Sequence, residues 1–384
     1  MNIPRTADIV IIGGGVMGAS AAYHLANCGV KNIVLLEKEG FFGTGATGRC
    51  AGGVRYQFST EVNIKLSLES LPMLERFAEE IGQDINYRQC GYLLIATYEK
   101  DAVNFKHNVQ LQNSLGVETQ LLTGDEVRAR LPLMKFEDAL AGTFHHKDGL
   151  VDPNSVVAGY ISAAQKMGVH AVTHAEVTGI RVRSNKVVAL ETNHGLIETH
   201  MLLNAAGPWS GLIGQMAGVD IPILPLRRQM FTTNALEEIP ANFPFVIDFG
   251  QSLYFHREGE GLLIGMSNHN EQPGFDQSVD EEFEFVNLEA AMARMPLLEH
   301  ARRAAHWAGL YEVTPDAHPI FGGCEVEGFL ICTGFSGHGF MHGPVAGKLM
   351  SEYILDGKFS TVDVSLLDLA RFEEGRLIKE YNVV

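Results

Sequence analysis

Cysteine is scarce in this sequence of 384 residues, and its spacing excludes two kinds of structural site. The five cysteines are odd in number and scattered, and no two of them form a Cys-x-x-Cys pair. Neither a disulfide framework nor a metal site is therefore predicted. Internal repeats, low-complexity linkers and long charge runs are also missing, so domain boundaries have to be inferred from changes of pattern.

Positive charge is scarce as well. Lys and Arg number 29 against 46 Asp and Glu, which gives a formal net charge of −17. This balance disfavours nucleic acid and anionic membranes as partners. No apolar run approaches the length of a membrane span, and the N-terminus enters a strand and a glycine loop without the regions of a signal peptide. We therefore expect a soluble cytoplasmic protein with no membrane span.

A glycine-rich turn near the start of the chain is the first sign of chemistry. Gly13, Gly15 and Gly18 satisfy the GxGxxG pattern. The first glycine allows a tight turn, the second lets a pyrophosphate approach the backbone, and the third permits close packing of helix on strand. Glu37 ends the next strand at the spacing expected for an acid that binds ribose hydroxyls. A strand at 8–12, a helix at 19–27 and a strand at 33–36 would form this dinucleotide-binding βαβ unit.

Two later glycine-rich loops favour FAD over NAD as the dinucleotide. Residues 43–53 form a loop rich in glycine and hydroxyl groups just past the ribose site, which suits a long, extended cofactor. Residues 334–340 lie between a strand expected at 329–332 and a helix expected to start near Pro344. A helix N-terminus there would stabilise negative charge on N1 and C2=O of a reduced flavin. Glycines placed only for tight packing are the alternative for this second loop.

Changes of periodicity predict an interleaved pair of domains, with the nucleotide domain built from three segments. Helical spacing marks 63–80, 153–167 and 283–294, and strand-like runs mark 91–96, 177–183, 187–203 and 222–266. We predict an FAD-binding domain from residues 1–86, 148–220 and 306–384, and a substrate domain from 87–147 and 221–305.

Several stretches together resemble a known family. In order along the chain they are IVIIGGGVMG, TGRCAGGVRYQF, DGLVDP, LLNAAGPWS, WAGLYEVTPDAHPIFG and GFSGHGFMHGP. With them the chain resembles, over nearly its whole length, the D-amino-acid oxidase-like FAD-dependent oxidoreductases. The resemblance is closest to the β subunits of L-proline dehydrogenase and heteromeric sarcosine oxidase. It implies a p-hydroxybenzoate-hydroxylase-like fold, α/β plus α+β, in which a Rossmann-type domain carries FAD beneath an antiparallel sheet.

The resemblance also implies how the cofactor is held. Gly309 occupies the position where monomeric sarcosine oxidases attach their flavin to a cysteine, so non-covalent FAD is expected. The histidine that tethers FMN in heterotetrameric sarcosine oxidase falls near Pro153, which leaves only non-covalent FMN at a subunit interface open. The residues that would contact FAD are Gly13, Gly15, Gly18, Glu37, Lys38, Ala46, Thr47, Arg49, Ala51, Gly52, Val177, Ala206, Gly207, Gly337, His338, Gly339, Phe340 and Met341.

The substrate anchors of related enzymes are absent here. Tyr311 stands where glycine oxidases have an arginine, and Met341 stands where monomeric sarcosine oxidases have a lysine. Arg55 is the remaining candidate, because a guanidinium forms two parallel charge-assisted bonds with a carboxylate; a surface ion pair or a phosphate contact is the alternative. Tyr254, as an active-site hydroxyl, and His338, beside the flavin, complete the catalytic candidates, with core packing and a spacer role as their alternatives.

These residues predict an FAD-dependent amino acid dehydrogenase or oxidase. The predicted reaction oxidises the C–N bond of a small amino or imino acid, L-proline or sarcosine or a similar compound, by hydride transfer to flavin N5. Two alternatives stay open. The chain would be a β subunit that is active only with a partner subunit or electron acceptor, or it would be an NAD-linked dehydrogenase.

Overall fold

A six-stranded sheet forms one half of the computed structural model, which describes residues 3–383. The strand order is β18-β19-β12-β1-β2-β8, and all neighbours are parallel except β18 and β19. The predicted βαβ unit lies at its centre, since β1 and β2 pair directly. The strands are β1 (Ile9–Ile12), β2 (Ile33–Leu36), β8 (His170–Val172), β12 (Leu202–Asn204), β18 (Ile320–Gly323) and β19 (Phe329–Thr333).

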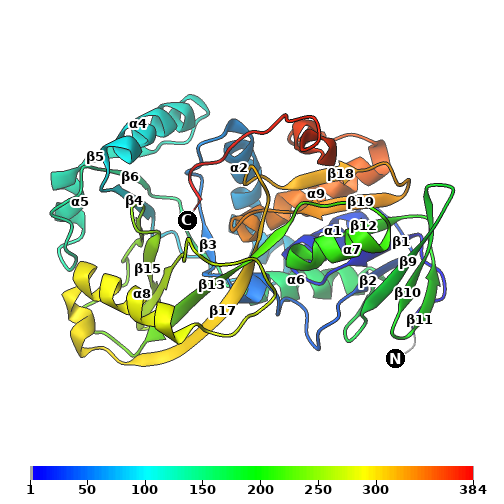
Figure 1. The fold of residues 1–384 in the computed structure, drawn as a ribbon, viewed down its shortest axis with the longest axis horizontal. Coiled ribbons are helices and arrows are strands. Elements are labelled where there is room, and N and C mark those ends of the chain that lie inside the picture. Colours follow the sequence, from blue (N-terminus) through cyan, green and yellow to red (C-terminus); the bar gives the residue numbers. More distant parts are fainter. Residues whose placement is uncertain (1–2, 384) are drawn as a thin grey trace.

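Helices cover one face of this sheet, and a small antiparallel sheet lies against the other (Figure 1). Side chains alternate along β1, so Ile9 and Ile11 pack with the helices while Val10 and Ile12 pack with the small sheet. Burial on both faces explains why these strands are continuous apolar runs. The covering elements are α1 (Val16–Asn27), α6 (Pro153–Lys166) and α9 (Gly339–Asp356) on one side, and β9 (Val177–Arg183), β10 (Lys186–Thr192), β11 (Gly195–Glu198) and α7 (Ser210–Met216) on the other.

An eight-stranded sheet, ordered β17-β13-β16-β15-β14-β4-β6-β5, forms the other half of the molecule. It is antiparallel as predicted, apart from the parallel pair β14 and β4. Its outer face packs on α8, while its inner face carries aromatic side chains. The elements are β4 (Tyr92–Ala96), β5 (Gln120–Thr123), β6 (Ala141–His145), β13 (Leu224–Thr233), β14 (Phe245–Asp248), β15 (Leu253–Glu258), β16 (Gly261–Met266), β17 (Arg303–Val313), α4 (Glu99–Ser114), α5 (Gly124–Arg130) and α8 (Glu281–Arg294).

The predicted domain boundary between residues 305 and 306 falls inside β17. This strand pairs with β13 from Arg303 to Val313, so all of it continues the eight-stranded sheet. Hydrogen bonds to β13 extend along the whole of β17 and keep it a single strand. The alternating side chains of β17 would suit either sheet, so the sequence does not show which sheet this strand joins. A short ribbon of β3 (Gly53–Val54) and β7 (Gly149–Leu150) lies where the chain passes between the two halves.

Helix α9 begins at Gly339, five residues before the position predicted from Pro344. A proline inside a helix removes one backbone donor and disturbs the ladder around it. The hydroxyl of Ser70 enters this ladder, donating to the carbonyl of Met341 at 2.6 Å and accepting from the N–H of Val345 at 3.4 Å. This side chain, from α2 (Glu61–Glu75), therefore supports the turn around the proline, which lets the helix start earlier than the sequence suggests.

The helix predicted over 63–80 is divided at Arg76 into α2 (Glu61–Glu75) and α3 (Phe77–Ile81). The break turns Phe77 onto Tyr160 of α6, where the two rings meet edge to face with centroids 4.9 Å apart. Tertiary packing thus overrides a continuous helical pattern. None of the helices within residues 3–383 combines the length and the apolar character needed to cross a membrane.

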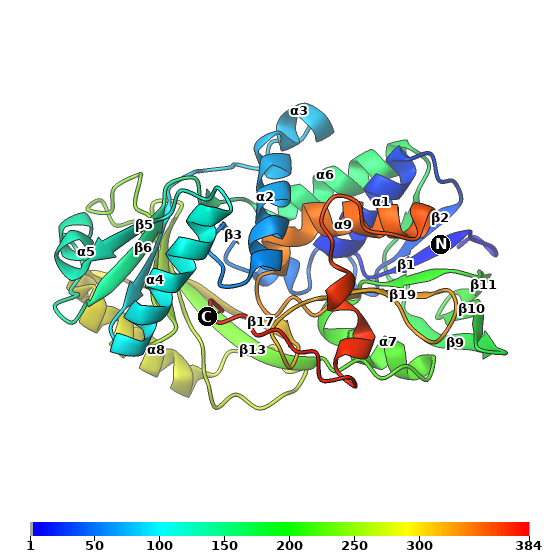
Figure 2. The ribbon, with the colours of Figure 1, turned by 90° about the horizontal axis from the view of Figure 1, so that it is seen from above.

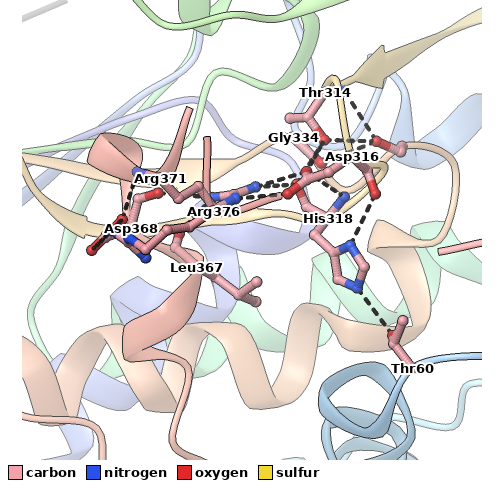
Figure 3. Close-up of polar contacts among 10 residues, drawn as sticks. Thr60, Thr314, Asp316, His318, Gly334, Leu367, Asp368, Arg371 and Arg376 are labelled. Carbon is pink, nitrogen blue, oxygen red and sulfur yellow. Dashed lines mark hydrogen bonds and ion pairs between the residues drawn. The ribbon is translucent and has the colours of Figure 1, made fainter. Parts of the chain in front are cut away.

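After α9 the chain turns back and runs across the molecule toward the eight-stranded sheet (Figure 2). Arg371 holds this segment against the loop that carries Asp316, because its guanidinium forms a bidentate ion pair with the Asp316 carboxylate at 2.9 and 3.0 Å (Figure 3). Further on, Glu380 accepts hydrogen bonds from the hydroxyl of Thr60 at 2.7 Å and the amide of Asn63 at 3.1 Å. The segment therefore reaches the region between the two halves of the molecule, where Val383 lines the cavity described below.

Candidate active site

One large cavity of about 610 Å³ lies between the two halves and is lined by residues of both sheets. Among the predicted cofactor residues, only Gly18 is not part of its wall. The three predicted catalytic residues, Arg55, Tyr254 and His338, also line it. The predicted residues in the wall are Gly13, Gly15, Glu37, Lys38, Ala46, Thr47, Arg49, Ala51, Gly52, Arg55, Val177, Ala206, Gly207, Tyr254, Gly337, His338, Gly339, Phe340 and Met341.

The glycines of the first turn are required by close contacts. Gly13 has φ +108°, and a Cβ there would lie 2.3 Å from the carbonyl oxygen of Ala205. A Cβ on Gly18 would lie 1.9 Å from the carbonyl oxygen of Gly13, so this glycine serves packing of helix on strand and not direct contact. No acidic residue occupies the first turn of α1. The N-terminus of α1 thus presents backbone N–H groups and the positive end of its dipole to the cavity.

Glu37 is held in place by the backbone on either side of it. Its Oε2 accepts from the N–H of Gly14 at 2.8 Å, and its Oε1 accepts from the N–H of Glu39 at 2.9 Å. A carboxylate offers about four acceptor positions, so its oxygens keep capacity for ribose hydroxyls. Beside it, the ammonium of Lys38 lies 4.0 Å from the ring centre of Trp209, a residue of the cavity wall that the sequence did not single out.

A second helix N-terminus, that of α9, enters the same cavity. Ser336 and Gly337 adopt positive φ values of 49° and 94° just before it. A Cβ on Gly337 would lie 2.3 Å from the ring of Tyr311, so only glycine fits there. The first turn of α9 contains no acidic residue. Its first N–H groups have no partners within the helix and are suited to stabilise negative charge.

Close contact between α1 and α9 brings these two helix ends together. A Cβ on Gly343 would lie 2.4 Å from a methyl group of Val16, and one on Gly347 would lie 2.2 Å from the hydroxyl of Ser20. Ser20 also donates a hydrogen bond to the carbonyl of Pro344 at 3.1 Å. The GHGFMHGP stretch therefore has two functions: its first two glycines shape the cavity wall, and its last, Gly343, allows the helices to cross together with Gly347 one turn further on.

His338 is 2% exposed, and neither ring nitrogen has a hydrogen-bond partner within residues 3–383. Burial, followed by the neighbouring His342, lowers the pKa of His338 well below its ordinary value. The imidazole is thus neutral at physiological pH, with one donor and one acceptor available. Unpartnered buried polar atoms indicate a bound group, and the polar edge of a flavin ring fits a neutral imidazole beside a helix N-terminus.

Arg55 is 6% exposed and lies over the ring of Phe58, 4.0 Å from its centre. Its Nη1 donates to the carbonyl oxygen of Gln57 and its Nη2 donates to that of Asn382. Within residues 3–383 it forms no ion pair, so it is not the surface ion pair weighed as the alternative. Main-chain oxygens already occupy part of its guanidinium, and its role as carboxylate anchor stays a prediction.

Aromatic side chains make up the cavity wall on the inner face of the eight-stranded sheet. Tyr254 on β15 is 7% exposed, and burial raises its pKa well above the ordinary value, which keeps its hydroxyl neutral. Tyr92 on β4 stacks on Phe245 of β14 with ring centres 4.2 Å apart. Sequence analysis found only Tyr254 among these residues. The alternation of the strands predicts that one face is apolar, but it does not show that the face covers a cavity.

Cys50 and Arg228 are two further residues of the wall. Burial raises the pKa of the Cys50 thiol to about 11, so it stays protonated and is a poor nucleophile. Arg228 projects from β13, where it pairs with Gly309 of β17. Across residues 3–383 no three His, Cys, Asp or Glu side chains gather in a way that would hold a metal ion.

Comparisons with known proteins agree with this geometry. The pattern of the FAD dependent oxidoreductase family matches residues 8–353. Sarcosine dehydrogenase, mitochondrial, of Mus musculus is 31% identical over 388 residues, covering 96% of this chain and 42% of that protein. The chain thus spans less than half the length of this relative.

Two solved structures have a similar fold. L-proline dehydrogenase from P. horikoshii superposes with a TM-score of 0.90 and 32% identity, over 98% of this chain and 100% of that one. Glycine oxidase from Bacillus cereus ATCC 14579 gives a TM-score of 0.79 and 26% identity, over 92% and 99% of the two chains. The nicotinamide alternative is set aside, because the matching family depends on FAD. With two helix N-termini, a ribose-binding acid and a neutral histidine around one cavity, the chain belongs to the family of FAD-dependent oxidoreductases and binds FAD as its cofactor.

Proposed function

We propose that the protein oxidises the C–N bond of a small amino or imino acid, such as L-proline or sarcosine. The observation that carries this proposal is the wall of the cavity on the side of the eight-stranded sheet. There Arg55 and Arg228 lie among tyrosine and phenylalanine side chains, and neither arginine is paired with a carboxylate of the described residues. Such a wall suits a small molecule that carries a carboxylate of its own. The similarity to proteins named sarcosine dehydrogenase, L-proline dehydrogenase and glycine oxidase supports the same substrate class.

The residues of the wall would bind and orient this substrate. Guanidinium groups hold its carboxylate and thereby fix the direction of the neighbouring carbon. The rings of Tyr92, Phe245 and Tyr254 exclude water around that carbon. Burial lowers the pKa of His338 well below its ordinary value, so its imidazole is too weak a base to take a proton from an ammonium group, and Tyr254 stays protonated; the amine is therefore expected to enter in its neutral form. When bound, FAD would supply the chemistry of accepting a hydride from the carbon next to nitrogen; the neutral amine is then left as an iminium cation, which gives the imine when its nitrogen loses a proton.

The N–H groups at the start of α9 would hold negative charge at the cofactor end of the cavity. Gly337 and Gly339 contribute to this wall, and Gly337 cannot carry a side chain without striking Tyr311. The charge-stabilising groups are therefore fixed before the reaction, which is the condition for electrostatic stabilisation of this kind to be effective.

An anaerobic titration of the purified holoprotein tests the proposal. The visible flavin spectrum is recorded while L-proline, sarcosine, glycine and a panel of D-amino acids are added in turn. Bleaching of the flavin band by one of these compounds is expected, because hydride transfer reduces the flavin. Bleaching by none of them, with the flavin bound and reducible by dithionite, would refute this substrate class.

The partner subunit and the electron acceptor are separate proposals within this function. A β subunit of a heteromeric enzyme would be reduced by substrate but would turn over only with a partner or an added dye. The bleached protein is then exposed to oxygen and to a dye in separate experiments. Reoxidation by oxygen indicates an oxidase, and reoxidation by the dye alone indicates a dehydrogenase. Reoxidation by neither indicates a subunit that depends on a partner. Non-covalent FMN at a subunit interface predicts a second flavin only in the complex.

A further inference from the structure

Two adjacent arginines on β13 have opposite surroundings. Because side chains alternate along a strand, Arg227 and Arg228 point to opposite faces of the sheet. Arg227 lies among acids, with Glu271 at 3.2 Å, Asp276 at 3.2 Å and Asp280 at 3.6 Å. Arg228 faces the cavity and forms no ion pair within the part of the chain that the structure describes.

The guanidinium of Arg228 is poorly satisfied by the protein. Its Nη1 donates to the carbonyl of Arg227 at 2.9 Å, whereas its buried Nε has no partner among residues 3–383. A guanidinium carries five N–H donors, and an unpartnered buried donor destabilises the protein unless a ligand satisfies it. An arginine in this state is prepared to accept an anion from the cavity.

The neighbours of Arg228 line the same cavity and carry no negative charge. The residue opposite it on β17 is Gly309, and Arg49 packs over this glycine so closely that a Cβ there would lie 2.9 Å from the Cβ of Arg49. The guanidinium lies 5.2 Å from the ring centre of Tyr311, close enough for the aromatic face to orient it. Tyr254, from β15, and Met230, two residues along β13, line the same part of the wall.

Arg55 differs from Arg228 in this respect. Both of its terminal nitrogens already donate to carbonyl oxygens, one from Gln57 and one from Asn382 of the C-terminal segment. Those bonds hold Arg55 against Phe58 and use two of its five N–H donors, one on each terminal nitrogen, whereas Arg228 uses one. Of the two arginines, Arg228 is the better equipped to form a bidentate pair.

We propose that Arg228 binds the carboxylate of the substrate, and that Arg55 is a positioning residue whose charge supports this site. The inference rests on the proposed function. It deepens that function by assigning the carboxylate anchor to β13, at a residue whose side chain emerges opposite Gly309, and not to the loop that carries Arg55.

Ligand binding tests the assignment without any need for turnover. The holoprotein is titrated with pyrrole-2-carboxylate and with pyrrole-2-carboxamide, which have nearly the same shape but differ in charge, and the shift of the flavin spectrum gives each Kd. We expect the wild type to bind the carboxylate more tightly than the carboxamide. Arg228→Met should raise the Kd of the carboxylate by roughly 10- to 100-fold and leave that of the carboxamide within about 3-fold.

Two further variants control for charge and folding. Arg303→Met removes one positive charge from an exposed arginine of β17, which pairs with Glu284 outside the cavity, and should leave both Kd values unchanged. Arg228→Lys keeps the charge but loses the planar pair of donors, so it should recover only part of the affinity. Flavin content and circular dichroism report whether each variant is folded.

The outcomes separate this inference from the proposed function. Equal carboxylate affinity in the wild type and a flavin-containing Arg228→Met variant would overturn the assignment, as would a wild type that binds both probes equally. A loss confined to Arg55→Met would return the anchor to Arg55. If no amine bleaches the wild-type flavin although the carboxylate binds through Arg228, the proposed function fails while the anion site stands.

Discussion

Removal of the Arg371 guanidinium should lower the stability of the protein more than removal of any exposed arginine. Arg371 is fully buried, and all five of its N–H groups donate hydrogen bonds (Figure 3). Two reach the carboxylate of Asp316 at 2.9 and 3.0 Å. The others reach the carbonyl oxygens of Leu367 at 2.8 Å, Asp368 at 2.9 Å and His318 at 3.0 Å.

Arg371→Met would leave a buried carboxylate without its counterion. Breaking a buried pair from one side costs about 3–5 kcal/mol, which corresponds to a fall in Tm of roughly 4–6 °C for a protein of this size. Asp316→Asn in the same background should restore part of the loss, since no uncompensated charge is then buried. Arg376→Met is the matched control, because Arg376 pairs with Asp368 on the surface and should cost no more than about 1 kcal/mol.

The pH dependence of this pair follows from the pKa of Asp316. Burial by itself would raise that pKa, but the hydrogen bonds and the charge of Arg371 outweigh it and hold the pKa below its ordinary value. The folded pKa is therefore lower than the unfolded one of about 3.9. The contribution is fully present above that value and disappears as the pH falls through the folded pKa.

Thermal unfolding of the holoprotein, followed by circular dichroism at pH 7 and at pH 4 and below, measures these effects. The difference between wild type and Arg371→Met should be full at pH 7 and shrink below about pH 4. If Arg371→Met and Arg376→Met unfold at the same temperature at pH 7, the buried pair does not stabilise the fold and the reasoning is refuted.

Three other perturbations follow from the same structure. Gly18→Ala places a Cβ 1.9 Å from the carbonyl oxygen of Gly13 and should abolish FAD binding. The control Gly274→Ala meets no atom within 4 Å and should retain its bound flavin. Equal flavin content in the two purified variants would contradict this prediction. Glu380→Ala removes the acceptor of several buried donors and should make the C-terminal segment sensitive to proteolysis while the two sheets resist it; an unchanged cleavage pattern would argue against that role. Burial lowers the pKa of His256 to about 4 and of His342 to about 3, so both bind protons mainly in the unfolded state. The free energy of unfolding should therefore fall by about 1.4 kcal/mol per pH unit for each of them below pH 6.5, and a flat profile in urea unfolding between pH 6.5 and 4.5 would refute this.

The cofactor site was predictable because its signals are local. The signals are the first glycine turn, the strands before and after its helix, and Glu37, and they all lie within about thirty residues of each other. Each residue type has one physical reason to be there. The early start of α9 was missed because it depends on Ser70, a residue of another helix whose hydroxyl enters the backbone ladder beside Pro344.

The substrate side depends on contacts between distant segments. Arg228 gives no sign in the sequence, because an arginine beside another arginine on a strand is equally consistent with a surface position. Only the pairing of β13 with β17 places it opposite Gly309 and inside the cavity. A strand pattern specifies which residues share a face, but not which face is covered.

By itself, the amino-acid sequence determined the βαβ unit, the dinucleotide turn and the family to which the chain belongs, since these follow from contiguous patterns of residue type. Only the tertiary structure decided which charged side chains meet in the cavity. Arg55 is tied to Asn382 across 327 residues of sequence, and Val383 completes the cavity wall. Such contacts are selected by how whole sheets and helices pack, and packing depends on residues too far apart for any local pattern to reveal them.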